Sequence, residues 1–204
     1  DFSDSILAAA TDLTVKGVGT ARATGADNGV EIDNTELLAQ DVISIAGDGS
    51  GDGINMTNGS RLGSGNYSGQ SYNADTVTLD GLGADAGIYF EDSTTAHAVQ
   101  AESVTLIGTA DTAGGEGIRM TDTNLIADAT AITLTGEGIA DGADGHDIAF
   151  EDAVSLDAAT DVTLTGDFMD LFLSGSTAPS VIGSGAPTIQ ARDDGDSDPS
   201  FASL

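Results

Sequence analysis

Val162-Thr163-Leu164-Thr165-Gly166 alternates apolar and hydroxyl-bearing residues and then ends on glycine. The same phrase occurs six times in the 204 residues, and its closing glycines are 30, 34, 27, 28 and 30 residues apart. Self-similarity at such a period is typical of stacked-repeat proteins, in which one supersecondary unit determines the whole architecture. The other five copies occupy residues 12–17, 42–47, 77–81, 104–108 and 132–136.

Each unit contains a second phrase, as in Gly117-Ile118-Arg119-Met120. Its apolar residues recur every second position, which predicts a strand, because a helix would space them three and four apart. The pairs expected to point inward are Val30/Ile32, Ile54/Met56, Ile88/Phe90, Ile118/Met120 and Ile148/Phe150. The residues expected to point outward are Glu31, Asn55, Tyr89, Arg119 and Ala149, which share no chemistry. A weaker third strand is expected at Leu37/Ala39, Ala96/Ala98, Leu125/Ala127 and Leu156/Ala158.

Three short strands in each unit predict an all-β chain that forms a right-handed parallel β-helix of about six coils of 27–34 residues. The Val, Ile and Thr residues that dominate these runs suit a pleated, half-buried surface. We expect the coils to fill residues 1–175, and residues 176–204 to form a C-terminal cap or a flexible acidic tail. Residues 2–10 are expected to form an incomplete coil able to dock on a neighbour, because an open solenoid end exposes unpaired strand edges.

A column of Asn and Asp residues follows the second strand: Asn34, Asn58, Asp92, Asp122 and Asp152. These residues favour turns, because their side chains bond nearby backbone and they tolerate left-handed conformations. We interpret the column as turn-forming, with a ligand-binding column as the alternative.

The charge balance limits the partners of the chain. Thirty-four acidic residues face five basic ones, for a net charge of −29. Such a surface repels nucleic acid and anionic membranes, whose phosphates are bound by Lys and Arg. No run of 18 apolar residues exists, so no membrane insertion is expected. The chain opens without a charged-then-apolar leader, so we expect any signal peptide to have been removed.

The acids suggest one possible cofactor, Ca²⁺. The loops between the first and second phrases are expected to stack on one side of the solenoid, so carboxylates of adjacent coils could share a calcium ion with backbone carbonyls. The alternative is a solvated acidic face. The candidate ligands are Asp48, Asp52, Asp85, Asp111, Asp141 and Asp144.

Catalytic patterns find little support. The only histidines, His97 and His146, lie in different parts of the repeat, and we interpret His146 as a surface loop residue. The chain is therefore not expected to be an enzyme. A polysaccharide-degrading β-helix stays as an alternative, to be favoured if carboxylates converge in a groove.

Residues 61–72 form the longest polar excursion from the repeat. Arg61, Tyr67 and Tyr72 are the candidates there for contact with a carbohydrate or a protein partner, because insertions in solenoids usually fall in surface loops that can carry binding. A plain loop without a binding role is the alternative.

The phrases Ile132-Thr133-Leu134-Thr135-Gly136 and Gly117-Ile118-Arg119-Met120-Thr121-Asp122-Thr123 resemble the repeats of filamentous-haemagglutinin-type bacterial exoproteins. The similarity covers residues from about 8 to 175. It implies a right-handed parallel β-helix shaft in a secreted or cell-surface adhesin, with a role in adhesion, biofilm matrix or an extracellular filament. The expected partners are further copies, joined through exposed coil ends, or other surface proteins and glycans. A calcium-dependent carbohydrate-binding shaft is a further alternative.

Overall fold

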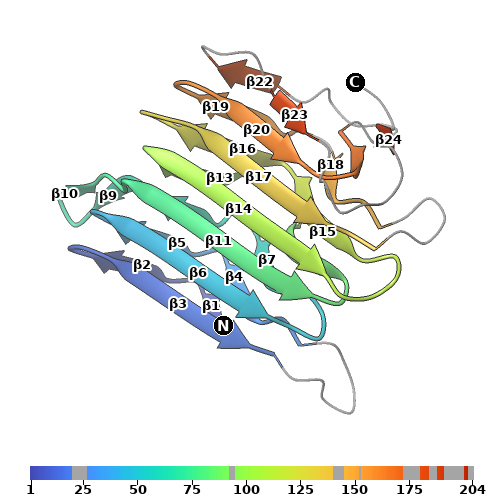
Figure 1. The fold of residues 1–204 in the computed structure, drawn as a ribbon. Coiled ribbons are helices and arrows are strands. Elements are labelled where there is room, and N and C mark those ends of the chain that lie inside the picture. Colours follow the sequence, from blue (N-terminus) through green and yellow to red (C-terminus); the bar gives the residue numbers. More distant parts are fainter. Residues whose placement is uncertain are drawn as a thin grey trace.

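A computed structural model describes residues 1–19, 27–91, 95–139, 145–151, 153–171, 180–183, 188–190 and 200–201, and these residues form strands, turns and bends without any helix. Most strands belong to three long sheets that run the length of the molecule (Figure 1). Sheet 1 contains β1 (Phe2–Ser3), β4 (Val30–Asp33), β7 (Ile54–Thr57), β12 (Ala86–Phe90), β15 (Glu116–Thr121), β18 (Ile148–Glu151), β21 (Phe168–Asp170) and β24 (Ser200–Phe201). Sheet 2 contains β2 (Ile6–Ala9), β5 (Glu36–Ala39), β8 (Arg61–Gly63), β13 (His97–Ala101), β16 (Thr123–Ala127), β19 (Ser155–Ala158) and β22 (Ser180–Gly183). Sheet 3 contains β3 (Leu13–Val18), β6 (Val42–Asp48), β11 (Thr76–Gly83), β14 (Ser103–Ala110), β17 (Ile132–Glu137), β20 (Val162–Thr165) and β23 (Thr188–Gln190).

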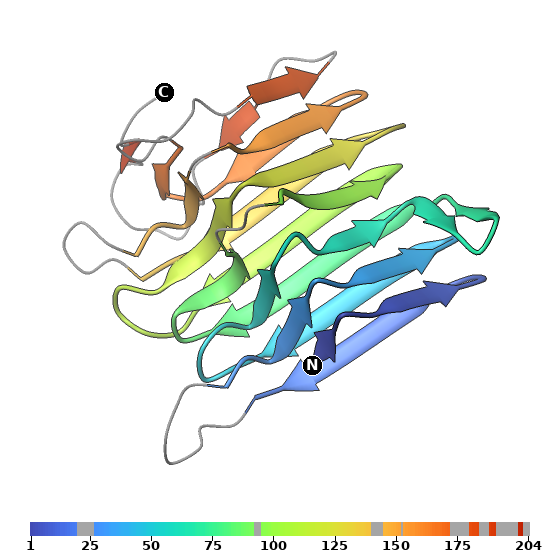
Figure 2. The same ribbon diagram turned by 180° about the vertical axis from the view of Figure 1, so that it is seen from behind.

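Neighbouring strands in all three sheets are parallel, and each coil passes from sheet 1 through sheet 2 to sheet 3 before it rises to the next coil. The front and back views show that the chain winds upward in a right-handed sense (Figures 1 and 2). The predicted parallel β-helix with three strands per coil is therefore confirmed. Across the described ranges, no helix is long and apolar enough to cross a membrane. In residues 176–204, β22, β23 and β24 each add a strand to one of the three sheets.

The register of the strands follows the repeat. In sheet 3 the six predicted phrases are aligned residue for residue, so that Leu79 lies between Ile45 and Leu106. Alternate side chains point into the space between the three sheets, where every predicted inward pair of sheet 1 is at most 2% exposed. The core is thus a stack of Ile, Leu, Val, Met and Phe layers, which explains why the chain needs few aromatic residues.

One predicted strand register is wrong. Ala96 and Ala98 were expected to face the core in the third strand of one coil, but Val99 and Ala101 do so, paired with Leu125 and Ala127. The corner that precedes β13 is longer than in the other coils, so the strand begins later in the sequence. His97 takes the corner position instead and is fully buried.

Two columns of glycine bring the backbones of sheets 3 and 1 into direct contact where each coil passes to the next. We call this contact the glycine seam. A Cβ added at Gly108 would lie 2.1 Å from the carbonyl oxygen of Gly117, and a Cβ added at Gly87 would lie 2.2 Å from the backbone nitrogen of Thr109. No side chain fits in these spaces. The seam consists of Gly17, Gly47, Gly81, Gly108 and Gly136 on sheet 3, and Gly29, Gly53, Gly87 and Gly117 at the entry to sheet 1.

The seam also holds the two ends of each acidic loop close together. One seam glycine lies near the end of the sheet 3 strand that precedes the loop, and the other lies at the entry to the sheet 1 strand that follows it. Five residues separate Gly47 from Gly53, and eleven separate Gly17 from Gly29. Loops of different length can therefore be accommodated outside the seam while the strands inside it keep their register.

The predicted turn column is confirmed where the structure describes it. Asn34, Asn58 and Asp122 have φ values of 43°, 54° and 46°, and Asp4 joins them with 49°. Asn34 donates a hydrogen bond from Nδ2 to Asp4 Oδ1 at 2.8 Å. Asp92 and Asp152 lie outside the described residues.

Replacing a seam glycine should destabilise the fold strongly. In Gly108→Ala the new methyl group meets backbone on the opposite strand, which cannot rotate away, so we expect the free energy of unfolding to fall by about 3 kcal/mol. Gly65→Ala is the control, because its methyl group would meet only the end of the Leu38 side chain at 2.9 Å. Urea unfolding followed by circular dichroism measures both; equal losses would contradict the seam.

Candidate functional site

The acidic loops stack on one another through their backbones. The backbone N–H groups of Ala84 and Asp85 both donate to Gly51 O, at 2.7 and 3.1 Å, and Glu116 N–H donates to Asp85 O at 2.9 Å. The predicted stacking of the loops is therefore confirmed for residues 48–52, 83–86 and 111–116, whereas residues 141–144 lie outside the described part of the chain. It gives the loops a fixed order and brings carboxylates of successive coils near one another.

The six candidate calcium ligands lie in different environments. Asp48, Asp85 and Asp111 are exposed, whereas Asp52 is only 9% exposed at the neck of its loop. Asp141 and Asp144 lie outside the described residues. Within the described ranges, no group of three or more His, Cys, Asp or Glu side chains is arranged to hold a metal ion. Calcium binding by the six residues stays a prediction.

Asp52 has a raised pKa. Its pKa is raised from 3.8 to about 6, chiefly by burial and in addition by the charges of Asp85 and Glu91, while the backbone N–H of Ala86 and the Arg119 charge act in the opposite direction. A carboxyl group that is costly to ionise thus lies at the edge of the acidic loops. It binds a proton more tightly in the folded than in the unfolded chain.

This raised pKa predicts a pH-dependent stability. The stabilising contribution of the neutral Asp52 is fully present below about pH 4 and is lost as the pH rises through about 6. We therefore expect Asp52→Asn to be more stable than the wild type at pH 7.5, by up to about 3 kcal/mol, and this advantage to vanish near pH 4. Asp48→Asn, which removes the same charge from an exposed position, is the control. Chemical unfolding at both pH values measures the difference; a gain that does not change with pH would contradict the assignment.

Arg119 is the centre of a polar network on the outer face of sheet 1. Its Nη2 lies 2.8 Å from Glu151 Oε1 and its Nη1 lies 3.5 Å from Glu116 Oε2. Its guanidinium carbon lies 5.0 Å from the centre of the Tyr89 ring, a cation–π contact. Tyr89, Arg119 and Glu151 belong to three successive coils, so the network ties these coils together.

Two of the outward residues of sheet 1, Tyr89 and Arg119, therefore interact, although the sequence suggested that these residues share no chemistry. Tyr89 and Arg119 are direct partners in the strand register, so their ring and guanidinium necessarily meet. Both carboxylates lie within ion-pair distance of Arg119, which carries a single positive charge. An open recess of about 460 Å³ adjoins the network, lined by Ala84, Asp85, Thr112, Ala113, Gly114, Gly115, Glu116 and Arg119.

Both histidines are buried, and the interpretation of His146 as a surface loop residue is wrong. His146 is 7% exposed, because its ring stacks on Phe168 with centres 4.4 Å apart. Its Nδ1 lies 3.4 Å from Glu116 Oε1. The stacking on a strand of the next coil accounts for its burial.

His97 occupies a column of buried polar residues at the corner between sheets 1 and 2. Thr35, Ser60 and Thr123 in this column donate hydrogen bonds from their hydroxyl groups to nearby carbonyls. His97 Nε2 lies 2.8 Å from Glu91 O, and since a carbonyl only accepts, Nε2 carries the hydrogen. Burial holds the pKa of His97 below its usual value, so the ring is neutral. The residue thus satisfies a corner carbonyl, as the hydroxyl groups do.

Asp147 breaks the glycine seam and is a residue whose role the sequence reading missed. It stands where Gly29, Gly53, Gly87 and Gly117 stand in other coils, and it is 5% exposed. Its carboxylate accepts hydrogen bonds from the backbone N–H of Gly138 at 2.6 Å, of Phe168 at 3.1 Å and of Asp167. The sequence did carry a signal for this role, because Asp147 is an acidic residue at a position that glycine occupies in the other coils.

Removing this carboxylate should leave three backbone donors without an acceptor. We expect Asp147→Ala to lower the free energy of unfolding by about 3 kcal/mol. Asp157→Ala, which removes an exposed acid from β19, is the control and should change stability little. Thermal unfolding compares the two variants, and similar melting temperatures for both would show that Asp147 has no such role.

The excursion within the third coil, between β8 and β11, is shorter than predicted. Arg61 belongs to β8, a regular strand of sheet 2, so only the segment from β9 (Gly65–Tyr67) to β10 (Gln70–Tyr72) leaves the repeat. These two strands form an antiparallel hairpin that protrudes from the solenoid (Figure 1). Ser68 and Gly69 at its tip have φ values of 52° and 80°, as a tight hairpin turn requires.

The three predicted contact residues are not equivalent. Tyr67 is 43% exposed on the hairpin, whereas Tyr72 is 8% exposed and its hydroxyl group lies 3.2 Å from Gln70 Oε1. Arg61 lies away from the tip of the hairpin, next to Glu36 in the neighbouring strand, with Nη1 3.7 Å from Oε1. Of the three, Tyr67 is the one that the hairpin presents to solvent.

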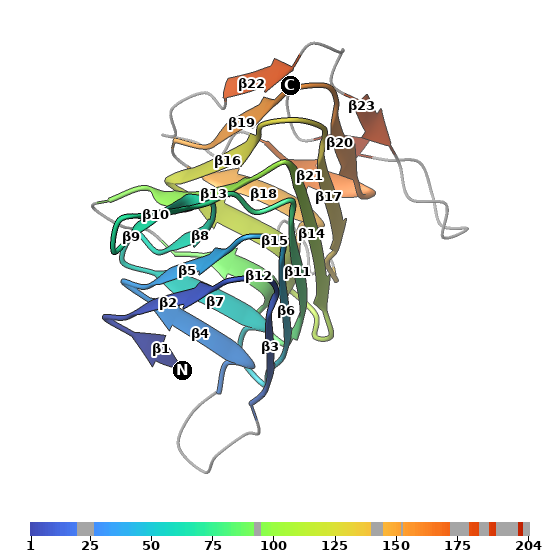
Figure 3. The ribbon, with the colours of Figure 1, turned by 90° about the vertical axis from the view of Figure 1, so that its left-hand side faces the viewer.

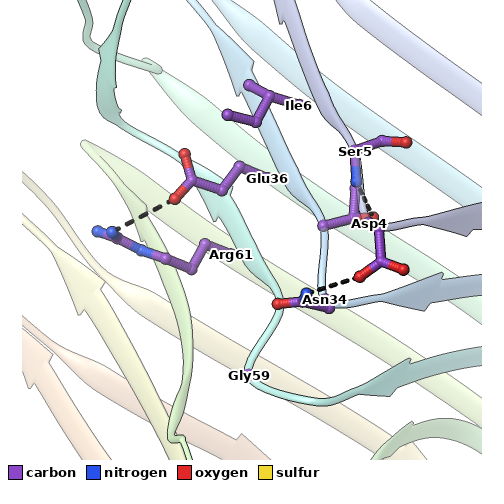
Figure 4. A pocket seen from close by; sticks show the side chains of 8 residues that line it. Asp4, Ser5, Ile6, Asn34, Glu36, Gly59 and Arg61 are labelled. Carbon is purple, nitrogen blue, oxygen red and sulfur yellow. Dashed lines mark hydrogen bonds and ion pairs between the residues drawn. The ribbon is translucent and has the colours of Figure 1, made fainter.

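Arg61 instead lines a recess at the corner between sheets 1 and 2, close to the first coil (Figure 4). The recess has a volume of about 260 Å³ and combines an apolar side chain, Ile6, with charged ones. The Arg61–Glu36 and Asn34–Asp4 pairs partner its polar groups internally. The full lining is Asp4, Ser5, Ile6, Asn34, Thr35, Glu36, Gly59 and Arg61.

Comparison with known proteins found no family model, no curated protein and no solved structure that matches the chain.

Proposed function

We propose that the chain is a structural or adhesive β-solenoid of a bacterial surface, biofilm matrix or extracellular filament, and that it associates end to end through its first coil. The observation that supports end-to-end association is the state of that coil. Its strands β1, β2 and β3 are the outermost strands of the three sheets, with one edge each unpaired (Figure 3). Such edges are templates for pairing with another coil of the same kind.

The side chains of the first coil support the same proposal. Leu7 is 39% exposed, whereas Leu37, its partner one coil further on, is fully buried. Leu13 and Val15 are likewise only partly buried, although they are paired with the fully buried Ile43 and Ile45. Within the part of the chain that the structure describes, these residues form a core layer without a further coil packed on it. A second copy docking there would bury them as the next coil buries its own layer.

The acids of sheet 1 do not favour the enzymatic alternative, because Glu116 and Glu151 are ion-paired with Arg119. Calcium-dependent carbohydrate binding rests on the loop acids, and among the four that the structure describes, only Asp52 is buried. An adhesive role would fit the hairpin, which presents Tyr67 away from the shaft.

Electron microscopy of the purified chain tests end-to-end association. We expect rods longer than one molecule for the wild type, and single short rods for Leu7→Glu, because a charge in the uncovered layer prevents docking. Ile6→Glu is the matched control: Ile6 is adjacent and 47% exposed, but lies on the outer face of sheet 2, so its rods should stay long. Circular dichroism verifies that both variants are folded. Single rods for the wild type at high concentration would overturn the proposal.

A further inference from the structure

The only lysine of the chain lies on an outermost strand of sheet 3. Lys16 belongs to β3, which pairs with β6 on one side and has no strand on the other. Its side chain is exposed, and it forms no ion pair with any residue that the structure describes. Asp12, the residue just before β3, is exposed as well. An acid and a base thus lie four residues apart along the unpaired edge of the first coil.

The first coil alone combines opposite charges at these two register positions. In the later coils none of the corresponding pairs contains a base, so the charge pattern does not belong to the repeat. It occurs only where the edge of the sheet is free, which points to a role at that edge. A lysine on an edge strand can also prevent pairing with another chain, and this alternative is tested below. The corresponding pairs are Val42/Ala46, Thr76/Asp80, Ser103/Ile107, Ala131/Thr135 and Asp161/Thr165.

The backbone groups of the same residues face the unpaired edge. Consecutive residues of a strand in a parallel sheet direct their N–H and C=O groups to opposite sides. Gly19, immediately after β3, donates its N–H to Asp48 O of β6 at 2.7 Å, so the odd-numbered residues of β3 face β6. Asp12, Thr14 and Lys16 therefore direct their N–H and C=O groups away from the solenoid, where a further strand would bind them.

We propose that β3 pairs antiparallel with β3 of a second copy, so that two solenoids join head to head. This pairing rests on the end-to-end association proposed above and specifies which end of the partner is used. With the two Thr14 residues opposite each other, Asp12 of each copy faces Lys16 of the other, and Leu13 faces Val15. Directly opposite residues of an antiparallel pair lie on the same face of the sheet. The uncovered apolar layers of the two copies therefore meet on the inner side, and two ion pairs form on the outer side.

Charge complementarity selects this arrangement over the alternatives. If one strand is moved by two residues, the apolar residues still face inward, but Lys16 then lies opposite Thr14 or Ala10 and the charges are unmatched. In a head-to-tail contact β3 would lie beside β23, and the register would place Lys16 next to the uncharged Gln190. A head-to-head contact has two-fold symmetry and closes on itself, so the expected product is a rod two molecules long.

Disulfide formation tests the geometry directly, because the chain contains no cysteine. Thr14→Cys places two thiols across the two-fold axis, where the Cα atoms of a hydrogen-bonded antiparallel pair are about 5.5 Å apart, a separation that a disulfide spans. Thr163→Cys, at the same register position on β20, is the control. In a glutathione redox buffer we expect roughly ten times more covalent dimer from Thr14→Cys, seen by electron microscopy as rods two molecules long. Equal yields, or no dimer from Thr14→Cys, would overturn the proposal.

Charge reversal tests the two ion pairs. Lys16→Asp and Asp12→Lys each place like charges opposite one another at two points of the interface, so we expect each to raise the dimer dissociation constant roughly fivefold in sedimentation equilibrium. The double variant Asp12→Lys/Lys16→Asp restores opposite charges and should return the constant to within about twofold of the wild type. Both residues are exposed, so melting temperatures should not change. A double variant as weak as the single ones, or tighter association of Lys16→Ala, which would show that the lysine blocks pairing, would overturn the proposal.

The outcomes also separate head-to-head pairing from the association on which it rests. Rods many molecules long that are shortened by Leu7→Glu, together with no disulfide from Thr14→Cys, would overturn head-to-head pairing and retain end-to-end association. Single rods of the wild type at high concentration would overturn both.

Discussion

Direct contact between the backbones of sheets 3 and 1 is the constraint on which the rest of this structure depends. At the seam, the hydrogen that a side chain would replace on Gly108 points at a carbonyl oxygen of Gly117, and Gly87 meets the backbone of Thr109 in the same way. The contact of Gly108 with the carbonyl oxygen is of the Cα–H···O type, which contributes about 0.5–1 kcal/mol, but the main effect of both contacts is steric. They fix where each coil closes, and so align every apolar layer with the next.

Because the seam closes each coil, the surface is free to carry charge. The acidic loops project from the pinched necks, where they add repulsion without entering the core. Burial of Asp52 makes its ionisation unfavourable, whereas Arg119 forms ion pairs with Glu151 of the next coil and with Glu116 of its own strand. On sheet 3, Thr and Ser are the most frequent residues on the outer face, at 11 of the 20 outward positions of β3, β6, β11, β14, β17 and β20.

The fold could be predicted from the sequence because each coil of a solenoid repeats the same sequence pattern at a nearly regular spacing. A phrase such as Val104-Thr105-Leu106-Ile107-Gly108 specifies strand, inward face and closing glycine together, and six aligned copies leave little freedom. Where a coil departs from the repeat, the prediction failed. The longer corner before His97 shifted one strand register, and the strand β8 at Arg61 was hidden beside the true excursion. Side-chain partnerships between coils, such as Tyr89 with Arg119, depend on register at the level of single residues, which pattern reading cannot provide.

Nuclear Overhauser effects across the seam would test the account most directly. If the two glycine columns mesh as described, the α protons of Gly87 should show strong cross-peaks to the amide proton of Thr109, and those of Gly117 to the amide proton of Glu137, since a Cβ at each glycine would lie 2.2 and 2.3 Å from these nitrogens. Observation of both pairs would establish the closure of successive coils. Their absence, in a folded chain whose sheet 3 strands still show parallel pairing, would contradict the seam as the feature that sets the register.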